Sequence, residues 1–204
     1  MAYFPFFVDL RGLRGLIAGG GAVALGKVQR LLPYGPRLTV VSPEPRAELL
    51  ELEGVEVLRR PFEETDLEGC DFAVAATDDR EVNRRAAALC KERRIPVNVA
   101  DSREEGTFLF PALLRRGALS VGVCASGASP AAAACLRDRF ARTLPDNVEE
   151  ILGFLEDLRQ ALPEGEARRR LLAALAAECM ELGRPLTGAE LKRRLAKAGE
   201  GEEQ

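Results

Sequence analysis

The chain has 204 residues, with 29 basic and 32 acidic side chains and a formal net charge of −3. This length allows one or two domains, and a hydrophobic share of 47% is enough to build a core. The sequence contains no histidine, which excludes Ser-His-Asp and Cys-His nucleophile systems, His-ligated zinc and the usual proton shuttle near neutral pH. Acid–base chemistry must therefore rest on carboxylates, lysine, tyrosine or cysteine.

The charge balance and the spacing of the cysteines exclude further classes of protein. Nonspecific nucleic-acid binding needs a marked basic excess, which this chain lacks. The five cysteines form no CxxC pair, so we expect no metal site and interpret them as small buried residues in a reducing compartment. The N-terminus does not resemble a signal peptide, and no apolar run approaches the ~20 residues that span a bilayer. The sequence predicts a cytoplasmic protein without nucleic-acid or membrane partners.

Strands and helices are predicted to alternate in the first half of the chain. The predicted strands are residues 13–18, 38–41, 55–58, 72–76 and 96–99. Helices are predicted over 22–32 and from the capping pair Asp78-Asp79 to about Arg93, with Glu81 three residues past Asp78. This alternation is typical of an α/β fold with a parallel sheet covered on both faces. We therefore expect a Rossmann-like α/β domain over residues 1–112.

The pattern changes in the second half. An apolar strand is predicted over 118–124, and Ser129 followed by Pro130 is expected to cap a helix that reaches Leu144. Further helices are predicted over 148–162, 164–182 and 187–196, the last beginning with a capping box of Thr187 and Glu190. The predicted division is a small α/β dimerisation segment over 113–145 and a helical domain over 146–204.

A glycine turn gives the strongest local signal. Gly19-Gly20-Gly21-Ala22-Val23 follows a predicted strand and opens a helix, a context that favours dinucleotide binding over a simple tight turn. Gly19 permits the sharp turn, and Gly21 leaves room for a pyrophosphate beside the backbone amides.

The second strand lacks the acidic residue that usually follows it. Ser42 and Pro43 stand there, with Glu44 and Arg46 close behind. A carboxylate would bind the ribose diol of NAD, whereas an arginine would accommodate the 2′-phosphate of NADP. Both cofactors remain open on this pattern, with Glu44 favouring NAD.

Candidate catalytic residues follow the later strands. Asp101 comes directly after the fifth strand, where ligands bind in open α/β sheets, although a solvated turn aspartate would fit the same position. Ala76 and Thr77 end the fourth strand and are expected to line the nicotinamide side. Arginines cluster at 115–116 and 137–142, either on a solvated face or as counterions for a polycarboxylate substrate.

Several motifs occur together in a recognisable order. They are Phe4-Pro5-Phe6-Phe7, Gly19-Gly20-Gly21-x-Val23-Ala24-x-x-Lys27, Leu38-Thr39-Val40-Val41-Ser42-Pro43, Ala75-Ala76-Thr77-Asp78-Asp79, Asn98-Val99-x-Asp101, Phe108-x-Phe110-Pro111 and Ser126-Gly127-x-Ser129-Pro130. Along essentially its whole length, the chain resembles the precorrin-2 dehydrogenase family, the dehydrogenase/ferrochelatase proteins of siroheme synthesis. The resemblance implies NAD-dependent oxidation of a tetrapyrrole, precorrin-2, to sirohydrochlorin, and in bifunctional members insertion of Fe²⁺ as a second substrate. It also implies a homodimer in which the segment after Phe110 exchanges contacts between subunits.

The resemblance also implies roles for single residues. Ala22-Val23 and Pro43-Glu44 would contact NAD, and Asp101 would serve dehydrogenation and, where present, chelation. The candidate substrate-binding residues are Ser126, Ser129, Arg115 and Arg137. Ala125 departs from the family, because the fused enzymes carry a phosphorylatable serine at the matching position, so phosphate regulation there is not expected.

A rival hypothesis is a non-catalytic sensor in which the Rossmann module binds a nucleotide and the helical tail binds a partner. It would account for the glycine turn and the helices but not for Asn98-Val99-x-Asp101. A short-chain dehydrogenase is excluded, because that chemistry uses a Tyr-x-x-x-Lys dyad. Neither tyrosine of the chain, Tyr3 or Tyr34, has lysine four residues later.

Overall fold

The computed structural model describes residues 3–200, with side chains described up to residue 196. The chain divides into two compact units, Met1–Phe110 and Pro111–Gln204, each of which is described by itself. The first contains β1 (Arg14–Ala18), α1 (Ala22–Leu31), η1 (Leu32–Tyr34), β2 (Arg37–Val41), α2 (Ala47–Leu50), β3 (Val55–Leu58), η2 (Glu64–Leu67), β4 (Phe72–Ala75), α3 (Arg80–Glu92) and β5 (Val97–Val99). The second contains β6 (Ala112–Arg116), β7 (Leu119–Val123), α4 (Pro130–Ala141), α5 (Val148–Ala161), α6 (Glu166–Leu182) and α7 (Gly188–Glu200).

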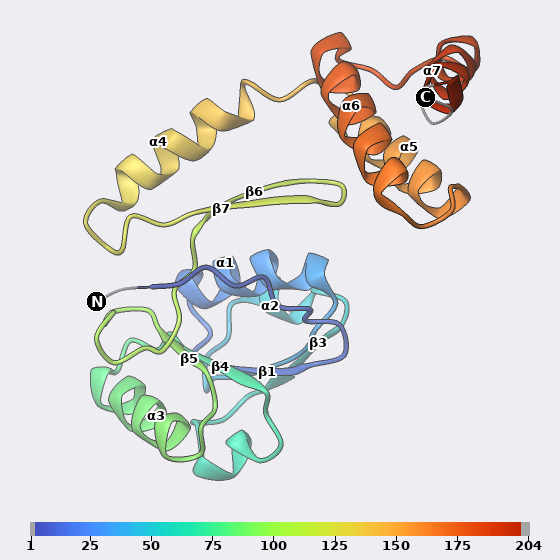
Figure 1. Cartoon of the computed structure of the whole chain (residues 1–204). Coiled ribbons are helices and arrows are strands. Elements are labelled where there is room, and N and C mark those ends of the chain that lie inside the picture. Colours follow the sequence, from blue (N-terminus) through green and yellow to red (C-terminus); the bar gives the residue numbers. More distant parts are fainter. Residues whose placement is uncertain (1–2, 201–204) are drawn as a thin grey trace. The chain divides into compact units, whose positions relative to one another are not determined.

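The first unit is built on a parallel sheet of five strands in the order β3-β2-β1-β4-β5 (Figure 1). Ala18 at the end of β1 lies opposite Val41 of β2 and Ala75 of β4, and Ala75 lies opposite Val99 of β5. The carboxyl ends of these strands are therefore level at one edge of the sheet. The Rossmann-like α/β prediction and its strands are confirmed.

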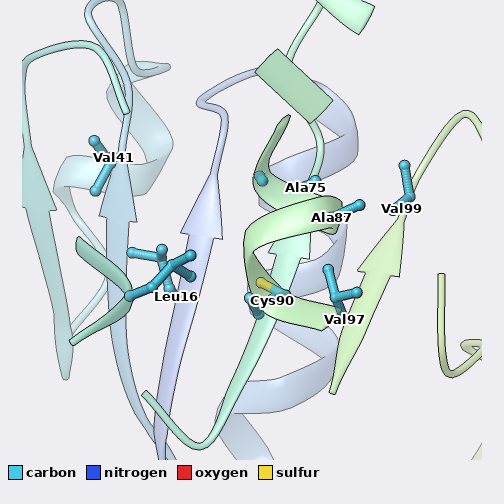
Figure 2. Close-up of a cluster of buried hydrophobic side chains, with 10 residues drawn as sticks. Leu16, Val41, Ala75, Ala87, Cys90, Val97 and Val99 are labelled. Atoms are coloured by element: carbon cyan, nitrogen blue, oxygen red, sulfur yellow. The ribbon is translucent and has the colours of Figure 1, made fainter. Parts of the chain in front are cut away.

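Side chains alternate between the two faces of the sheet, and each face has its own core. One core holds Ile17, Val40 and Val74 with Val28 of α1. The other holds Leu16 and Val97 with Cys90 of α3, and Figure 2 shows α3 lying over this face. Both faces of a parallel sheet must be covered, because its strands are apolar throughout. This explains why the predicted strands read as continuous hydrophobic runs.

The free edge of β5 is covered by the chain that follows it. The Thr107 amide donates a hydrogen bond to the Val97 carbonyl (2.7 Å), and the Val97 amide donates to Thr107 Oγ1 (2.8 Å). Gly106 lies so close that an added Cβ would meet Val97 O at 3.3 Å. The loop after Asp101 therefore supplies the partners that a neighbouring strand would otherwise provide.

The second unit begins with an antiparallel hairpin of β6 and β7, in which Arg116 pairs with Leu119. Strand β6 was not predicted, because its two arginines suggested a charged cluster and concealed the apolar residues before them. Helix α4 packs on the hairpin and ends at Ala141, not at Leu144 as predicted. Pro145 has no N–H to donate to the Ala141 carbonyl and disfavours helical geometry at Leu144, so the helix cannot continue to the predicted end.

The last helices share a small core. Ile151 of α5, Leu175 and Cys179 of α6, and Leu186 before α7 are its buried members. The predicted capping box is confirmed, since Glu190 Oε2 accepts the Thr187 amide (2.7 Å) and Thr187 Oγ1 accepts the Glu190 amide (3.4 Å). Within residues 3–200, no helix has the length and apolar character needed to cross a membrane.

The start of α3 corrects one sequence detail. Its N-cap is Asp79, whose side chain accepts hydrogen bonds from the amides of Glu81 (2.8 Å) and Val82 (3.3 Å). The expected box of Asp78 and Glu81 was therefore wrong by one residue. Two adjacent aspartates satisfy the same capping preference, so spacing alone did not distinguish them.

We predict that Leu175→Ala destabilises the helical core by about 2–5 kcal/mol, because truncation of a fully buried leucine leaves a cavity. Urea unfolding followed by circular dichroism measures the change. Leu182 of the same helix is 47% exposed, so Leu182→Ala should cost far less. Equal losses for the two variants would contradict the assigned core.

Candidate functional site

The glycine turn after β1 is pressed against two neighbouring chain segments. Gly19 has a φ of +123°, and an added Cβ would lie 2.2 Å from the Ala76 carbonyl oxygen. A Cβ on Gly20 would lie 2.5 Å from Ser42 Oγ. Both contacts are closer than any real Cβ contact, so these positions require glycine. The turn is therefore held between the ends of β2 and β4.

Gly21 differs from its two neighbours because it borders open space. An added Cβ there would meet no atom within 4 Å, and Gly21 is the N-cap of α1 with an ordinary φ of −80°. No side chain among the described residues caps this helix end, and its first turn carries no acidic residue. The amides of Ala22 and Val23 thus begin a helix whose positive dipole end is open to an anion. The residues present fit the pyrophosphate of a dinucleotide.

The segment after β2 borders the same turn. Ser42 is buried, and its amide donates to the Leu58 carbonyl (3.0 Å), whereas Pro43 and Glu44 are exposed. The Arg46 amide donates to the Gly20 carbonyl (3.0 Å), while its guanidinium pairs with Glu48 at 2.6 Å. Because Arg46 is already paired, the geometry favours Glu44 as the group open to a ribose diol. This agrees with the preference for NAD over NADP.

A buried amide joins the ends of β4 and β5. Asn83 Oδ1 accepts from the Thr77 amide (3.0 Å), and its Nδ2 donates to the Thr77 carbonyl (3.0 Å) and to Asp101 Oδ1 (3.3 Å). Asn83 is 1% exposed, whereas Asp101 is exposed. The structure therefore brings together Thr77 and Asp101, which the sequence suggested separately.

A second group of polar side chains lies around the segment that follows β5. Lys27 of α1 places its ammonium 3.8 Å from the centroid of the Phe110 ring, and burial lowers its pKa to about 8. Asn98 Nδ2 donates to the Phe108 carbonyl (3.0 Å), while the buried Asn98 Oδ1 has no partner among the described residues. In the first unit, the half-buried Lys27 ammonium and the Asn98 Oδ1 acceptor, which has no partner among the described residues, therefore lie near residues 108–110.

The four predicted substrate-binding residues all lie in the second unit. Ser129 Oγ accepts the Ala132 amide (3.1 Å), so Ser129 is the N-cap of α4 as predicted. Ser126 adopts a positive φ of +50° in the turn before it. Arg137 pairs with Asp138 at 2.6 Å, and Arg115 is exposed on β6. Their binding role stays a prediction.

Asn83 was not among the predicted site residues, although the sequence contains a signal for it. Asn83, Ala86, Ala87 and Cys90 are the buried residues of α3. Their spacing is that of one helix face, and an amide within an apolar stripe needs buried hydrogen-bond partners. A polar residue in the apolar stripe of the first turn of α3 was the signal in the sequence.

Comparison with known proteins identifies the first unit. A family model described as "Putative NAD(P)-binding" matches residues 6–112, more than half of the chain. The chain belongs to this family. The matched range includes the glycine turn, the segment after β2 and the Thr77–Asn83–Asp101 cluster.

Other similarities extend over the second unit. A siroheme synthase of Methylococcus capsulatus is 40% identical over 195 residues, which cover 90% of this chain and 41% of the relative. A siroheme synthase of Chromobacterium violaceum is 37% identical over 211 residues, covering 98% and 45%. The chain thus spans less than half the length of these relatives. The solved structure "SirC, precorrin-2 dehydrogenase" matches with a TM-score of 0.77 and 26% identity, covering 97% of this chain and all of that one.

We predict that Gly21→Ala folds normally but weakens NAD⁺ binding at least ~10-fold, because its methyl group enters the space beside the α1 amides. Isothermal titration with NAD⁺ measures the affinity. Gly26→Ala is the matched control, since Gly26 lies on the same helix and its added Cβ also meets no atom within 4 Å. Undiminished affinity in Gly21→Ala would place the pyrophosphate elsewhere.

Proposed function

We propose that this protein oxidises precorrin-2 to sirohydrochlorin with NAD⁺ in siroheme biosynthesis. The observation that carries the proposal is the likeness to a solved precorrin-2 dehydrogenase along nearly the whole of both chains. The sequence relatives point to the same pathway, since they are siroheme synthases. Fold alone would not support an activity, but here the polar residues at the sheet edge fit the reaction as well.

The residues at the sheet edge form two groups, one suited to bind the cofactor and one placed for the reaction. The open N-terminus of α1 offers amides to a pyrophosphate, with Glu44 beside it for a ribose. Thr77 and Asp101 follow the next strands of the sheet, on the side where a nicotinamide would extend from that position. Binding and reaction would therefore share one edge of the sheet.

The oxidation removes two hydrogens from the tetrapyrrole. NAD⁺, when bound, supplies the hydride acceptor. The second hydrogen leaves as a proton, and Asp101 is the exposed carboxylate that follows β5 directly, so we assign it the role of general base. Such a base contributes about 10²–10⁴ in rate when proton transfer accompanies the reaction. The products are sirohydrochlorin, NADH and a proton released to water.

Insertion of Fe²⁺ into sirohydrochlorin is a second activity to be tested with the same protein. Metal insertion requires removal of pyrrole protons, and in a chain without histidine a carboxylate is the available base. Asp101 would serve both reactions. The metal would then be a substrate rather than a resident cofactor.

We predict that the wild-type protein forms NADH and sirohydrochlorin from precorrin-2 and NAD⁺ under anaerobic conditions. Asp101→Asn should lower the turnover number about 10²–10⁴-fold while leaving NAD⁺ affinity unchanged, because the substitution removes the base but keeps the shape. Absorbance spectra separate sirohydrochlorin from siroheme when Fe²⁺ is added.

Each outcome of this assay has a defined meaning. Absence of NADH formation by the wild type would refute the dehydrogenase and favour a nucleotide sensor. Full turnover by Asp101→Asn would remove Asp101 from the chemistry. Siroheme formed above the rate of the protein-free control would establish iron insertion, and its absence would restrict the protein to oxidation.

The homodimer implied by the family resemblance is part of the proposal. No residue of the β6–β7 hairpin is fully buried, and α4 buries only Ala133. Leu136 and Phe140 on α4 are 55% and 42% exposed. A two-stranded hairpin is marginally stable alone. A second copy packed on segment 113–145 would bury these side chains, which supports this segment as the dimerisation part. Within the second compact unit, the buried core of Ile151, Leu175, Cys179 and Leu186 lies in 146–204, which supports our proposal of a helical domain there.

We predict that the double variant Leu136→Glu/Phe140→Glu is monomeric at micromolar concentration, since charged groups cannot be buried in the interface without a partner. Light scattering coupled to gel filtration reports the mass. Leu182→Glu, on an exposed position of α6, serves as control and should remain dimeric. A dimeric double variant would move the interface away from α4.

A further inference from the structure

Asn83 makes more hydrogen bonds than any other buried side chain at the sheet edge. In addition to the three contacts described above, Thr77 Oγ1 lies 2.8 Å from Asn83 Oδ1. The orientation of the amide is fixed, because the Thr77 N–H can only donate and the Thr77 carbonyl can only accept. Nδ2 therefore points to the Thr77 carbonyl and to Asp101, and neither N–H of the amide remains unused.

This bonding links one residue that follows β4 to one that follows β5. Asn83 belongs to α3, whose start is fixed by the Asp79 cap and whose apolar face is buried. Its amide is consequently held by the protein core, while Asp101 lies at the surface. An exposed carboxylate normally samples several rotamers. The bond to a buried donor favours one orientation of the Asp101 carboxylate relative to Thr77.

We propose that Asn83 is a positioning residue for the reaction: it aims the Asp101 carboxylate at the tetrapyrrole and keeps it in register with the nicotinamide side of the site. The bond engages Oδ1, so Oδ2 is the oxygen that would receive the substrate proton. This inference rests on the proposed function, because it assigns Asn83 an action through the general base. Asn83 itself touches neither substrate nor cofactor.

Several charged side chains of α3 and of the loop after Asp101 are engaged with one another or with the backbone. Glu81 and Arg84 of α3 pair with each other at 2.9 Å, and Arg84 also lies 3.9 Å from Glu105 of the following loop. Asp79 is engaged as the helix cap. Asn83 Nδ2 donates a hydrogen bond to the Asp101 carboxylate (3.3 Å). A neutral donor of this kind orients a carboxylate with less electrostatic stabilisation of its charge than a cationic donor gives.

The decisive measurement is a double-mutant cycle on the turnover number. Asn83→Leu removes the amide and should lower the turnover number about 10–100-fold with an unchanged KM for NAD⁺. In the Asp101→Asn background the same substitution should lower the residual rate less than about 3-fold, because the group that Asn83 acts through is already lost. Equal factors in both backgrounds would overturn the proposal and leave Asn83 a structural role.

Asn83→Asp gives a second readout with a nearly isosteric side chain. Its Oδ1 keeps the contacts to the Thr77 amide and hydroxyl, whereas the new oxygen replaces the Nδ2 donor and faces both the Thr77 carbonyl and Asp101 Oδ1, at the former 3.0 and 3.3 Å separations. Two carboxylates at this distance resist simultaneous ionisation, so more alkaline solution is needed to keep both ionised. The acid limb of the pH–rate profile should move to higher pH by about one unit or more. A profile identical to that of the wild type would contradict the inference.

Cys90→Ala controls for lost stability alone. Cys90 lies on the same buried face of α3 but bonds to neither Thr77 nor Asp101, so this variant should melt earlier while its pH profile and turnover stay unchanged. These variants distinguish failure of the positioning role of Asn83 from failure of Asp101 as the general base. If Asp101→Asn is inactive and Asn83→Asp keeps the wild-type profile, only the positioning role falls. If Asp101→Asn is fully active, the general base itself is wrong.

Discussion

The ends of β1 and β4 meet in a contact that leaves no room for a side chain at Gly19. The Ala76 carbonyl occupies the place where a Cβ would stand, and Ser42 does the same beside Gly20. This contact turns the chain sharply enough for α1 to begin directly above the sheet edge. The open amides of α1 and the polar residues after β4 and β5 thereby come to one edge, which is where a dinucleotide binds in this class of fold.

Much of the first unit could be predicted, because its signals are local. Apolar runs bounded by turn residues marked the strands, and the glycine turn marked the strand-to-helix transition. The predictions were wrong where two residues fitted the same capping signal, or where charged side chains concealed the apolar pattern of a strand. Asp78 and Asp79 were equivalent as caps, and β6 ends in two arginines that suggested a solvated cluster.

The candidate site was predictable only in part, for a related reason. Asp101 could be found because its position after a strand already fixes its location in the fold. Asn83 comes from a helix, and its contacts to Thr77 and Asp101 depend on how α3 packs on the sheet. Long-range packing of this kind leaves one trace in the sequence, a polar residue within an apolar stripe. The sequence contains no comparable signal for a binding role of Ser126, Ser129, Arg115 and Arg137 in the second unit.

The loop that carries Asp101 also closes the β5 edge, and this has a consequence for how a large ligand enters. Thr107 satisfies the amide and the carbonyl of Val97, so lifting the loop would expose both groups. The loop is therefore a poor candidate for a lid. If Asp101 is the base, as we propose, a flat macrocycle would reach it without displacement of the Thr107 contacts to Val97. Access to Asp101 would then be controlled by segments other than the loop of residues 101–107.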